Sequence, residues 1–314
     1  MSPHRHASPK LTNISRRGFL KSATLLASGL VTGDQRGWAV EASPQRVIVG
    51  GHPWVYAARL PKYDITPVLP QIFADMSYAG LDGVELMSIA LEPADAVERI
   101  AALAAKHQLP VLGASFGAAM WDRTQHETIW ATAQVVIPRL GQLGGRTLGT
   151  SVGATPALEP KTEAQLDDQA AFLRKLIALC QEHGITLNLH NHTYEVINDL
   201  HDLKGTLARI PDVKLGPDLN WLVRAHIDPA AFLRQYGQQV VFMHLRDQKA
   251  DGRWSEALGE GTTDFVAIAA ALRDIHFAGR AVIELAHERD FTPTRPIRDS
   301  LKMSREFVRR VLGY

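Results

Sequence analysis

The feature that most constrains the fold is a repeated alternation of short apolar runs with longer amphipathic segments. The short runs have the length and composition of buried strands, and helical periodicity follows them, as in residues 164–183 and 265–276. Eight strand-then-helix units without a break in composition predict one α/β domain over residues 43–314, a closed (β/α)8 barrel of the TIM type. The expected strands are residues 46–51, 83–88, 109–115, 146–153, 185–191, 213–219, 240–246 and 281–287.

An open, doubly wound sheet is the alternative architecture. Such sheets normally contain fewer repeats and carry a glycine-rich first turn that holds a dinucleotide. The first turn of this chain, residues 50–61, reads GGHPWVYAARLP and lacks the G-x-G-x-x-G pattern. The barrel is therefore the favoured prediction.

Composition argues against a nucleic-acid-binding protein and against a fold held together by disulfide bonds. With 46% hydrophobic and 21% charged residues, the chain has the make-up of a soluble globular protein. A formal net charge of +1 with no basic stripe argues against a nucleic-acid partner. The one cysteine, Cys180, excludes an internal disulfide framework, and its apolar surroundings predict a buried helix residue.

The first 42 residues have the pattern of a targeting signal, so they are not part of the predicted fold. Residues 15–21 read S-R-R-G-F-L-K, and the apolar run over residues 22–33 is too short and too rich in Gly, Ser and Thr to span a membrane stably. This segment resembles a twin-arginine (Tat) export signal, with cleavage expected after Ala42 or, alternatively, after Ala39. The resemblance implies recognition by the Tat machinery, a periplasmic or otherwise exported location and no membrane span after processing. A basic disordered tail is the alternative.

Ionisable side chains stand where the expected strands end, although buried strands are usually apolar throughout. The densest case is LNLHNHTYEV at residues 187–196, in which two histidines follow an apolar run. The carboxyl ends of barrel strands meet on one rim, which carries the catalytic groups of such barrels. In chain order, the rim residues are His52, Glu85, Ser115, Ser151, His190, His192, Asp218, His244, Arg246, Asp247, Glu284 and His287.

Four rim residues from the last four strand ends form an expected site for one divalent metal ion: His190, Asp218, His244 and Glu284. Two imidazoles and two carboxylates suit Mn, Co, Fe, Zn or Mg and are too rich in nitrogen for a dedicated calcium site. Any one of them alone would be interpreted as a buried side chain with a hydrogen-bond partner. Because the four residues take equivalent positions on adjacent strands, a shared metal site is favoured over four unrelated buried side chains.

The same rim supplies candidate groups for catalysis and substrate binding. The acid–base candidates are Glu284, Glu195, His192 and Glu85. The substrate-binding candidates are His52, Trp54, Trp221, Arg246, Lys249 and Glu260. Indole faces suit stacking on the C–H surfaces of sugars, and cationic side chains neutralise developing negative charge. The alternatives are a packing role for the tryptophans and a solvated turn carboxylate for Glu260.

Six short motifs, one per barrel unit and in the expected order, carry a family resemblance. They are GLDGVELMS, GITLNLHNHTYEV, GPDLNWLVRAHIDP, FMHLRDQ, ALGEGTTDF and AVIELAHERD. Together they resemble the xylose isomerase-like TIM barrels, the sugar phosphate isomerase/epimerase superfamily, over roughly residues 46–312. The resemblance implies that Asp218, His244 and Glu284 are metal ligands. It also places His190 where ketose epimerases usually carry a glutamate, so the second of their two proton-carrying glutamates is missing.

The chemistry that these residues suit is proton abstraction beside a metal-bound carbonyl, through an enediolate. The sequence thus predicts an exported, divalent-metal-dependent isomerase or epimerase. Because sugar phosphates are largely cytoplasmic and no phosphate-cradling glycine run follows the last strands, the expected substrate is an unphosphorylated keto-sugar or cyclitol. One alternative is a lyase, dehydratase or hydrolase that acts on 3-keto-glycosides or inososes. A second alternative is a carbohydrate- or metal-binding protein that catalyses no reaction. A third alternative is a phosphodiesterase.

Overall fold

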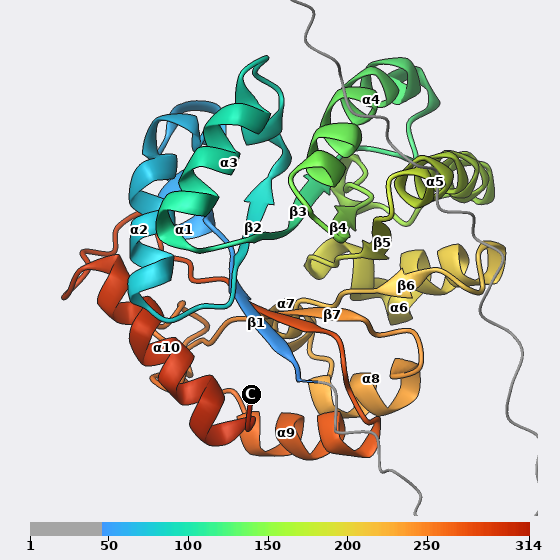
Figure 1. Cartoon of the computed structure of the whole chain (residues 1–314). Coiled ribbons are helices and arrows are strands. Elements are labelled where there is room, and N and C mark those ends of the chain that lie inside the picture. Colours follow the sequence, from blue (N-terminus) through green and yellow to red (C-terminus); the bar gives the residue numbers. More distant parts are fainter. Residues whose placement is uncertain (1–45) are drawn as a thin grey trace, which may run out of the picture. The chain divides into compact units, whose positions relative to one another are not determined.

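Eight parallel strands follow one another around the barrel in a computed structural model that describes residues 46–314 (Figure 1). The expected Tat signal over residues 1–42 lies outside these described residues. The sheet order is β6-β5-β4-β3-β2-β1-β8-β7, and bridges from Leu215 to Val240 and from Asp218 to His244 join β6 to β7. The strands are β1 (Ile48–Gly51), β2 (Val84–Met87), β3 (Val111–Gly117), β4 (Thr147–Ser151), β5 (Thr186–Leu189), β6 (Lys214–Leu215), β7 (Phe242–Leu245) and β8 (Arg280–Ile283). The predicted (β/α)8 barrel is confirmed.

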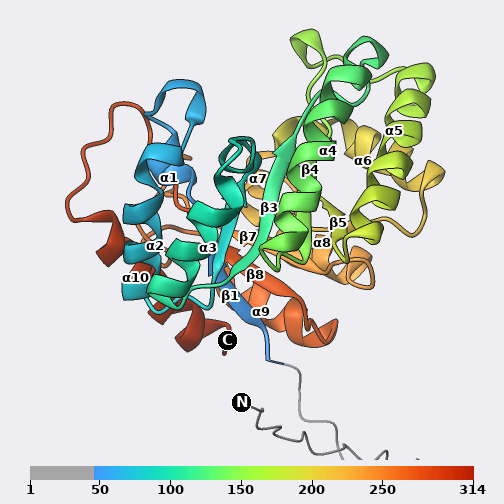
Figure 2. The same cartoon turned by 45° about the horizontal axis from the view of Figure 1, so that its top comes forward.

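Helices surround the strands and bury their own apolar faces against them (Figure 1). Helices α10, α2 and α3 lie side by side on one part of this outer layer (Figures 1 and 2). Within residues 46–314, no helix has the length and apolar character needed to cross a bilayer. The helices are α1 (Trp54–Ala57), α2 (Leu69–Tyr78), α3 (Ala96–His107), α4 (His126–Gln142), α5 (Glu163–Glu182), α6 (Thr193–Arg209), α7 (Leu219–Arg224), α8 (Pro229–Tyr236), α9 (Phe265–Asp274) and α10 (Ile297–Val311).

Side-chain hydrogen bonds fix where several of these helices begin. Helix α5 starts with a capping box, in which Thr162 and Gln165 satisfy each other's backbone N–H groups. Asp228 caps α8 and Asp264 caps α9. Cys180 lies buried within α5, as predicted.

The sixth strand is shorter than the run of residues 213–219 predicts. Only Lys214 and Leu215 pair as a strand, because Gly216 and Pro217 bend the chain directly afterwards. Pro217 has no N–H to donate, although its carbonyl oxygen accepts the N–H of His244 at 2.9 Å. A Cβ on residue 216 would collide with the side-chain amide of Asn188, so only glycine fits there. The bend places Asp218 at the rim that the carboxyl ends of the strands form.

Candidate active site

The carboxyl ends of the strands enclose one cavity with a volume of about 540 Å³. Its lining mixes imidazole, carboxylate, guanidinium, hydroxyl and indole groups, whereas the core beneath it is apolar. Side chains from seven of the eight strand ends line it: His52, Met87, Ser115, Ser151, His190, His244 and Glu284. The cavity therefore occupies the position that the strand-end pattern predicts.

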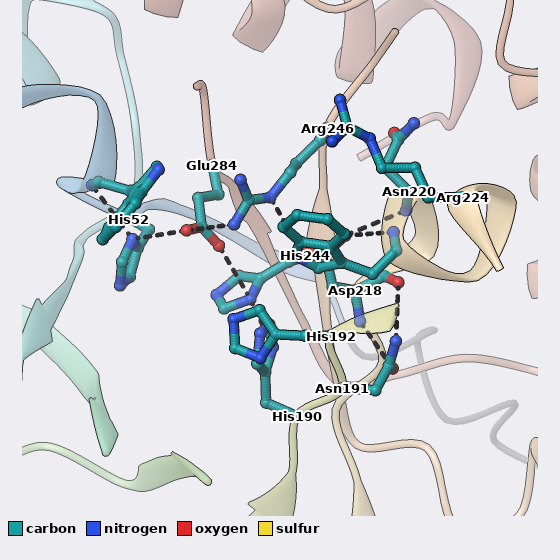
Figure 3. Close-up of polar contacts among 12 residues, drawn as sticks. His52, His190, Asn191, His192, Asp218, Asn220, Arg224, His244, Arg246 and Glu284 are labelled. Carbon is teal, nitrogen blue, oxygen red and sulfur yellow. Dashed lines mark hydrogen bonds and ion pairs between the residues drawn. The ribbon is translucent and has the colours of Figure 1, made fainter. Parts of the chain in front are cut away.

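Three of the four predicted metal residues come together (Figure 3): His190 and His244 line the cavity, and the fully buried Asp218 lies beside them. Each of His190, Asp218 and His244 offers one ligand atom, and these atoms lie within 4.8 Å of one another. The Nδ1 atoms of the two histidines are 3.0 Å apart. The fourth residue, Glu284, places its Oε2 atom 3.2 Å from Nδ1 of His244. All four residues thus belong to one cluster.

Glu85 lies behind this cluster and orients His244. Its Oε2 atom is 2.5 Å from Nε2 of His244, and its side chain has no exposed surface. Burial would lower the pKa of His244, but the negative charges of Glu85 and Glu284 outweigh burial and raise it to about 9. Because Glu85 occupies Nε2, the other ring nitrogen of His244 faces His190.

Arg246 bridges the two carboxylates of the cluster. Its Nε donates to Oδ2 of Asp218 at 2.7 Å, and its Nη2 lies 2.5 Å from Oε1 of Glu284. Burial would raise the pKa of Glu284, but the charges of Arg246, His52 and His244 hold it well below its usual value. Burial dominates for Asp218, whose pKa is raised despite Arg246. Glu284 is therefore the carboxylate that stays ionised most firmly.

Backbone contacts fix the position of Asp218. Its Oδ1 accepts the N–H groups of Asn220 and Trp221 at the start of α7, at 3.0 and 3.2 Å. The side-chain amide of Asn191, from the end of β5, pairs with both the backbone N–H and the carbonyl of Asp218 (Figure 3). Asp218 is thus held by the helix that it caps and by the neighbouring strand end.

The donor atoms of the cluster fit a divalent metal ion. Burial and the nearby His244 and His192 keep the pKa of His190 well below its usual value, so its imidazole is neutral and has a lone pair to offer. The Oε2 atom of Glu284 is buried and makes no well-formed hydrogen bond, although Nδ1 of His244 lies 3.2 Å away. Buried polar atoms normally have a partner, and a cation would supply one. A bound metal would displace the Nδ1 proton of His244, and the two nitrogen and two oxygen donors would then be a set that first-row transition metals bind.

His52 and Ser115 extend the polar network along the opposite side of Glu284. Nδ1 of His52 lies 3.2 Å from Oε1 of Glu284, and its Nε2 lies 3.0 Å from Oγ of Ser115. The backbone N–H of Trp54 also reaches Nδ1 of His52, at 3.2 Å. Glu284, His52 and Ser115 consequently form one chain of polar contacts along the cavity wall.

The structure gives different surroundings to His192 and Glu195, although Nδ1 of His192 stays 3.4 Å from Oε2 of Glu195. His192 lines the cavity and stacks on Tyr194, with 5.0 Å between ring centroids. Glu195 lies outside the lining, and Ser151 Oγ, the backbone N–H of Val152 and the backbone N–H of His192 all donate to its carboxylate at 2.6 to 2.7 Å. Burial would raise the pKa of Glu195, but hydrogen bonds, above all from His192, lower it.

Lys249 and Glu260, like the buried Glu85 and Asp218, are not among the residues that line the cavity. Lys249 is exposed in the loop after β7, and Glu260 binds Nη2 of Arg295 at 2.6 Å with both oxygens. Trp54 and Trp221 do line the cavity. The lining also includes Tyr63, Tyr194, Glu288 and Arg289, which were not among the site candidates. Tyr194 belongs to the same HNHTYE run as His190, whereas the other three stand in loops without periodicity.

Comparisons with known proteins agree with this fold. The family model described as "Xylose isomerase-like TIM barrel" matches residues 73–307. Inosose dehydratase of Geobacillus kaustophilus (strain HTA426) is 24% identical over 174 residues, which are 49% of this chain and 55% of that protein. The chain thus spans about half the length of this curated relative.

Solved structures share the fold at low sequence identity. A D-allulose 3-epimerase from Methylomonas sp. is 20% identical with a TM-score of 0.67, covering 86% of this chain and 99% of that one. A 3-keto-D-glucoside 4-epimerase from E. coli is 19% identical with a TM-score of 0.65, covering 83% and 100%. An L-ribulose 3-epimerase is 22% identical with a TM-score of 0.67, covering 85% and 95%.

Proposed function

Because the chain belongs to the xylose isomerase-like TIM barrel family, we propose that it is a divalent-metal-dependent isomerase or epimerase of an unphosphorylated keto-sugar or cyclitol. One observation carries the proposal: neutral His190, His244, Asp218 and Glu284 form one cluster of possible metal ligands, and three of them line the cavity. The epimerases and the dehydratase named above act on small sugars or a cyclitol, as their names state.

His190, Asp218, His244 and Glu284 would hold the metal ion. When bound, a divalent cation polarises a carbonyl and so acidifies the neighbouring C–H bond. Glu284 is the proposed proton acceptor at that carbon, because its carboxylate is ionised and lines the cavity beside the metal residues. Glu85 serves as a positioning residue behind His244.

His192 is the proposed second proton carrier. Its ring lies in the cavity wall, and 32% of the side-chain surface is exposed. The ring can therefore exchange protons with solvent. Glu195 would position it, since the carboxylate accepts the backbone N–H of His192 and stays out of the lining. The indoles of Trp54 and Trp221 offer apolar surfaces for the sugar ring.

The charges at the site support an unphosphorylated substrate. Arg246 is the cation beside the metal residues, and Asp218 and Glu284 already neutralise it. An export route through the Tat machinery, proposed from residues 15–21, would also place the protein where unphosphorylated sugars are found.

A lyase or dehydratase acting on an inosose or a 3-keto-glycoside is the second candidate. The chain from Glu284 through His52 to Ser115 favours it, because a hydroxyl at its end can donate a proton to a departing oxygen. The similarity to inosose dehydratase points in the same direction.

Solvent exchange tests the proposal. Metal-loaded protein in D2O should incorporate deuterium at the carbon beside the carbonyl of at least one member of a panel of keto-sugars and inososes. Product analysis then separates isomerisation and epimerisation from elimination. Absence of exchange across the whole panel would contradict both candidates.

Elemental analysis tests the metal residues. His190→Ala should lower the metal content per chain, whereas His107→Ala, at the end of α3, should keep the stoichiometry of the natural protein. Full metal content in His190→Ala would show that the cluster is not the metal site.

A further inference from the structure

The ring of His192, the proposed second proton carrier, is packed among other aromatic rings. It stacks on the ring of Tyr194, with 5.0 Å between centroids and 15° between planes. The ring of His190 meets it edge to face at 4.8 Å, and the indole of Trp221 is tilted against it at 5.6 Å. These contacts fix the plane of the imidazole. They do not decide which nitrogen faces the cavity, because a ring that is turned over keeps its plane and exchanges nitrogen positions with carbon positions.

The hydroxyl group of Tyr194 makes that distinction. Its oxygen lies 2.9 Å from Nδ1 of His192, within hydrogen-bond range. Oε2 of Glu195 lies 3.4 Å from the same nitrogen. If the ring were turned over, a C–H group would face both oxygens and the hydrogen bond to Tyr194 would be lost. Tyr194 therefore holds Nδ1 on its own side and leaves Nε2 as the nitrogen for a substrate in the cavity.

Ser151, at the end of β4, fixes the hydroxyl group of Tyr194 in turn. Its Oγ lies 3.2 Å from the oxygen of Tyr194 and donates to Oε1 of Glu195 at 2.7 Å. Ser151 and Glu195 are both buried, so solvent does not compete strongly for these contacts. The three side chains thus join the start of α6 to the end of β4, and the orientation of the His192 ring depends on this connection.

A histidine that carries protons at Nε2 needs a constant partner at Nδ1. The imidazolium bears a proton on both nitrogens, and when Nε2 gives its proton away Nδ1 keeps its own. The oxygen of Tyr194 can accept the N–H of Nδ1 in both states. The carboxylate of Glu195, at 3.4 Å, stabilises the positive charge of the imidazolium. The surroundings of Nδ1 therefore suit a proton carrier that works through Nε2.

We propose that Tyr194 is a positioning residue for proton transfer by His192, an inference that rests on the proposed function. Glu284 takes a proton from the carbon beside the carbonyl, so one C–H bond breaks and the carboxylate gains the proton. The N–H at Nε2 of His192 then breaks, and its proton forms the new C–H bond on that carbon. Exchange with solvent afterwards restores both groups. Tyr194 acts only through His192, by keeping Nε2 directed into the cavity.

The change Tyr194→Phe tests this role, because it removes the hydroxyl group and keeps the ring that stacks on His192. The readout is the ratio of epimer formed to deuterium incorporated, measured in D2O on the member of the keto-sugar and inosose panel that exchanges fastest. We expect this ratio to fall about tenfold or more, the loss expected from one hydrogen bond to a charged group, while exchange in the starting sugar is retained. The matched control is Tyr78→Phe, at an exposed position of α2, which should retain both values.

A second readout needs no substrate. In protein that carries isotopically labelled histidine, the nitrogen NMR resonance of Nδ1 of His192 should move in Tyr194→Phe, because its hydrogen-bond partner is gone. The same resonance should stay in place in Tyr78→Phe. The variant His192→Gln lacks the signal and so identifies it.

Four results would each overturn the proposal: an unchanged ratio, an equal loss of exchange and epimer formation, exchange without any epimer in the natural protein, or an unmoved Nδ1 resonance. If Tyr194→Phe does not fold, Ser151→Ala takes its place, because it removes the contact that fixes the same hydroxyl group. If no member of the panel exchanges, the proposed function fails, and the Nδ1 resonance still decides whether Tyr194 positions the ring.

Discussion

Replacing Glu85 with glutamine should remove a pH-dependent part of the stability of the metal-free protein. The carboxylate of Glu85 lies 2.5 Å from Nε2 of His244 and is fully buried. Its charge, together with that of Glu284, raises the pKa of His244 to about 9 in the folded state. In the unfolded chain a histidine titrates near ~6.5.

The direction of the effect follows from this difference. A histidine whose folded pKa exceeds its unfolded pKa stabilises the fold fully below the unfolded value and loses that stabilisation as pH rises through the folded value. A rise from ~6.5 to about 9 corresponds to about 3 kcal/mol, at about 1.4 kcal/mol per pH unit. The free energy of unfolding should therefore fall by about this amount between pH ~6.5 and ~9. In Glu85→Gln the amide carries no charge, so the slope should shrink to the part that Glu284 and Asp218 maintain.

Urea unfolding of chelator-treated protein across this pH window measures the slope. The control is Glu182→Gln, the same chemical change at the exposed end of α5, which should keep the slope of the natural protein. A natural protein whose stability does not change over the window would refute the charge argument. An undiminished slope in Glu85→Gln would show that other groups titrate there.

Three further substitutions test separate parts of the structure by urea unfolding near neutral pH. Arg246→Met should cost about 3–5 kcal/mol, because two buried carboxylates lose their shared cation, and a loss below 1 kcal/mol would contradict that pairing. Glu195→Gln should cost about 1–3 kcal/mol, since an amide N–H then faces donors such as the backbone N–H of His192; an unchanged midpoint would speak against this capping role. Glu260→Gln should cost less than about 1 kcal/mol, because its pairing with Arg295 is partly exposed to solvent, and a larger loss would assign this pair a structural role that its exposure does not suggest.

The positions of the strand ends were predictable because they follow from periodicity and one geometric rule. Observed β5, Thr186–Leu189, lies within the run of residues 185–191, and the next residue, His190, stands on the rim as expected. Arg246 follows His244 by two positions, so alternation along a strand directs both side chains to the same face. The structure brings both into the site.

The separate roles of His192 and Glu195, in the polar run after β5, could not be derived from periodicity. His192 and Glu195 are three positions apart, the spacing of a capping box, and α6 begins with both halves of this box present. The cap draws the Glu195 carboxylate toward the backbone and leaves the His192 ring in the cavity wall. Lys249 likewise stands in a loop whose course depends on tertiary contacts, and no alternation of residues indicates where its side chain points.

His190 bears most directly on which reaction the site serves. A neutral imidazole there, where the family resemblance implies a glutamate in ketose epimerases, leaves Glu284 as the carboxylate available to accept a proton from carbon. Epimerisation returns a proton to the opposite face of the same carbon, which one carboxylate on one side cannot do. Isomerisation and elimination have no such need, because the proton returns on the same face or goes to a departing oxygen. Epimerisation would accordingly depend on His192, and the chain through His52 to Ser115 would serve the other two reactions.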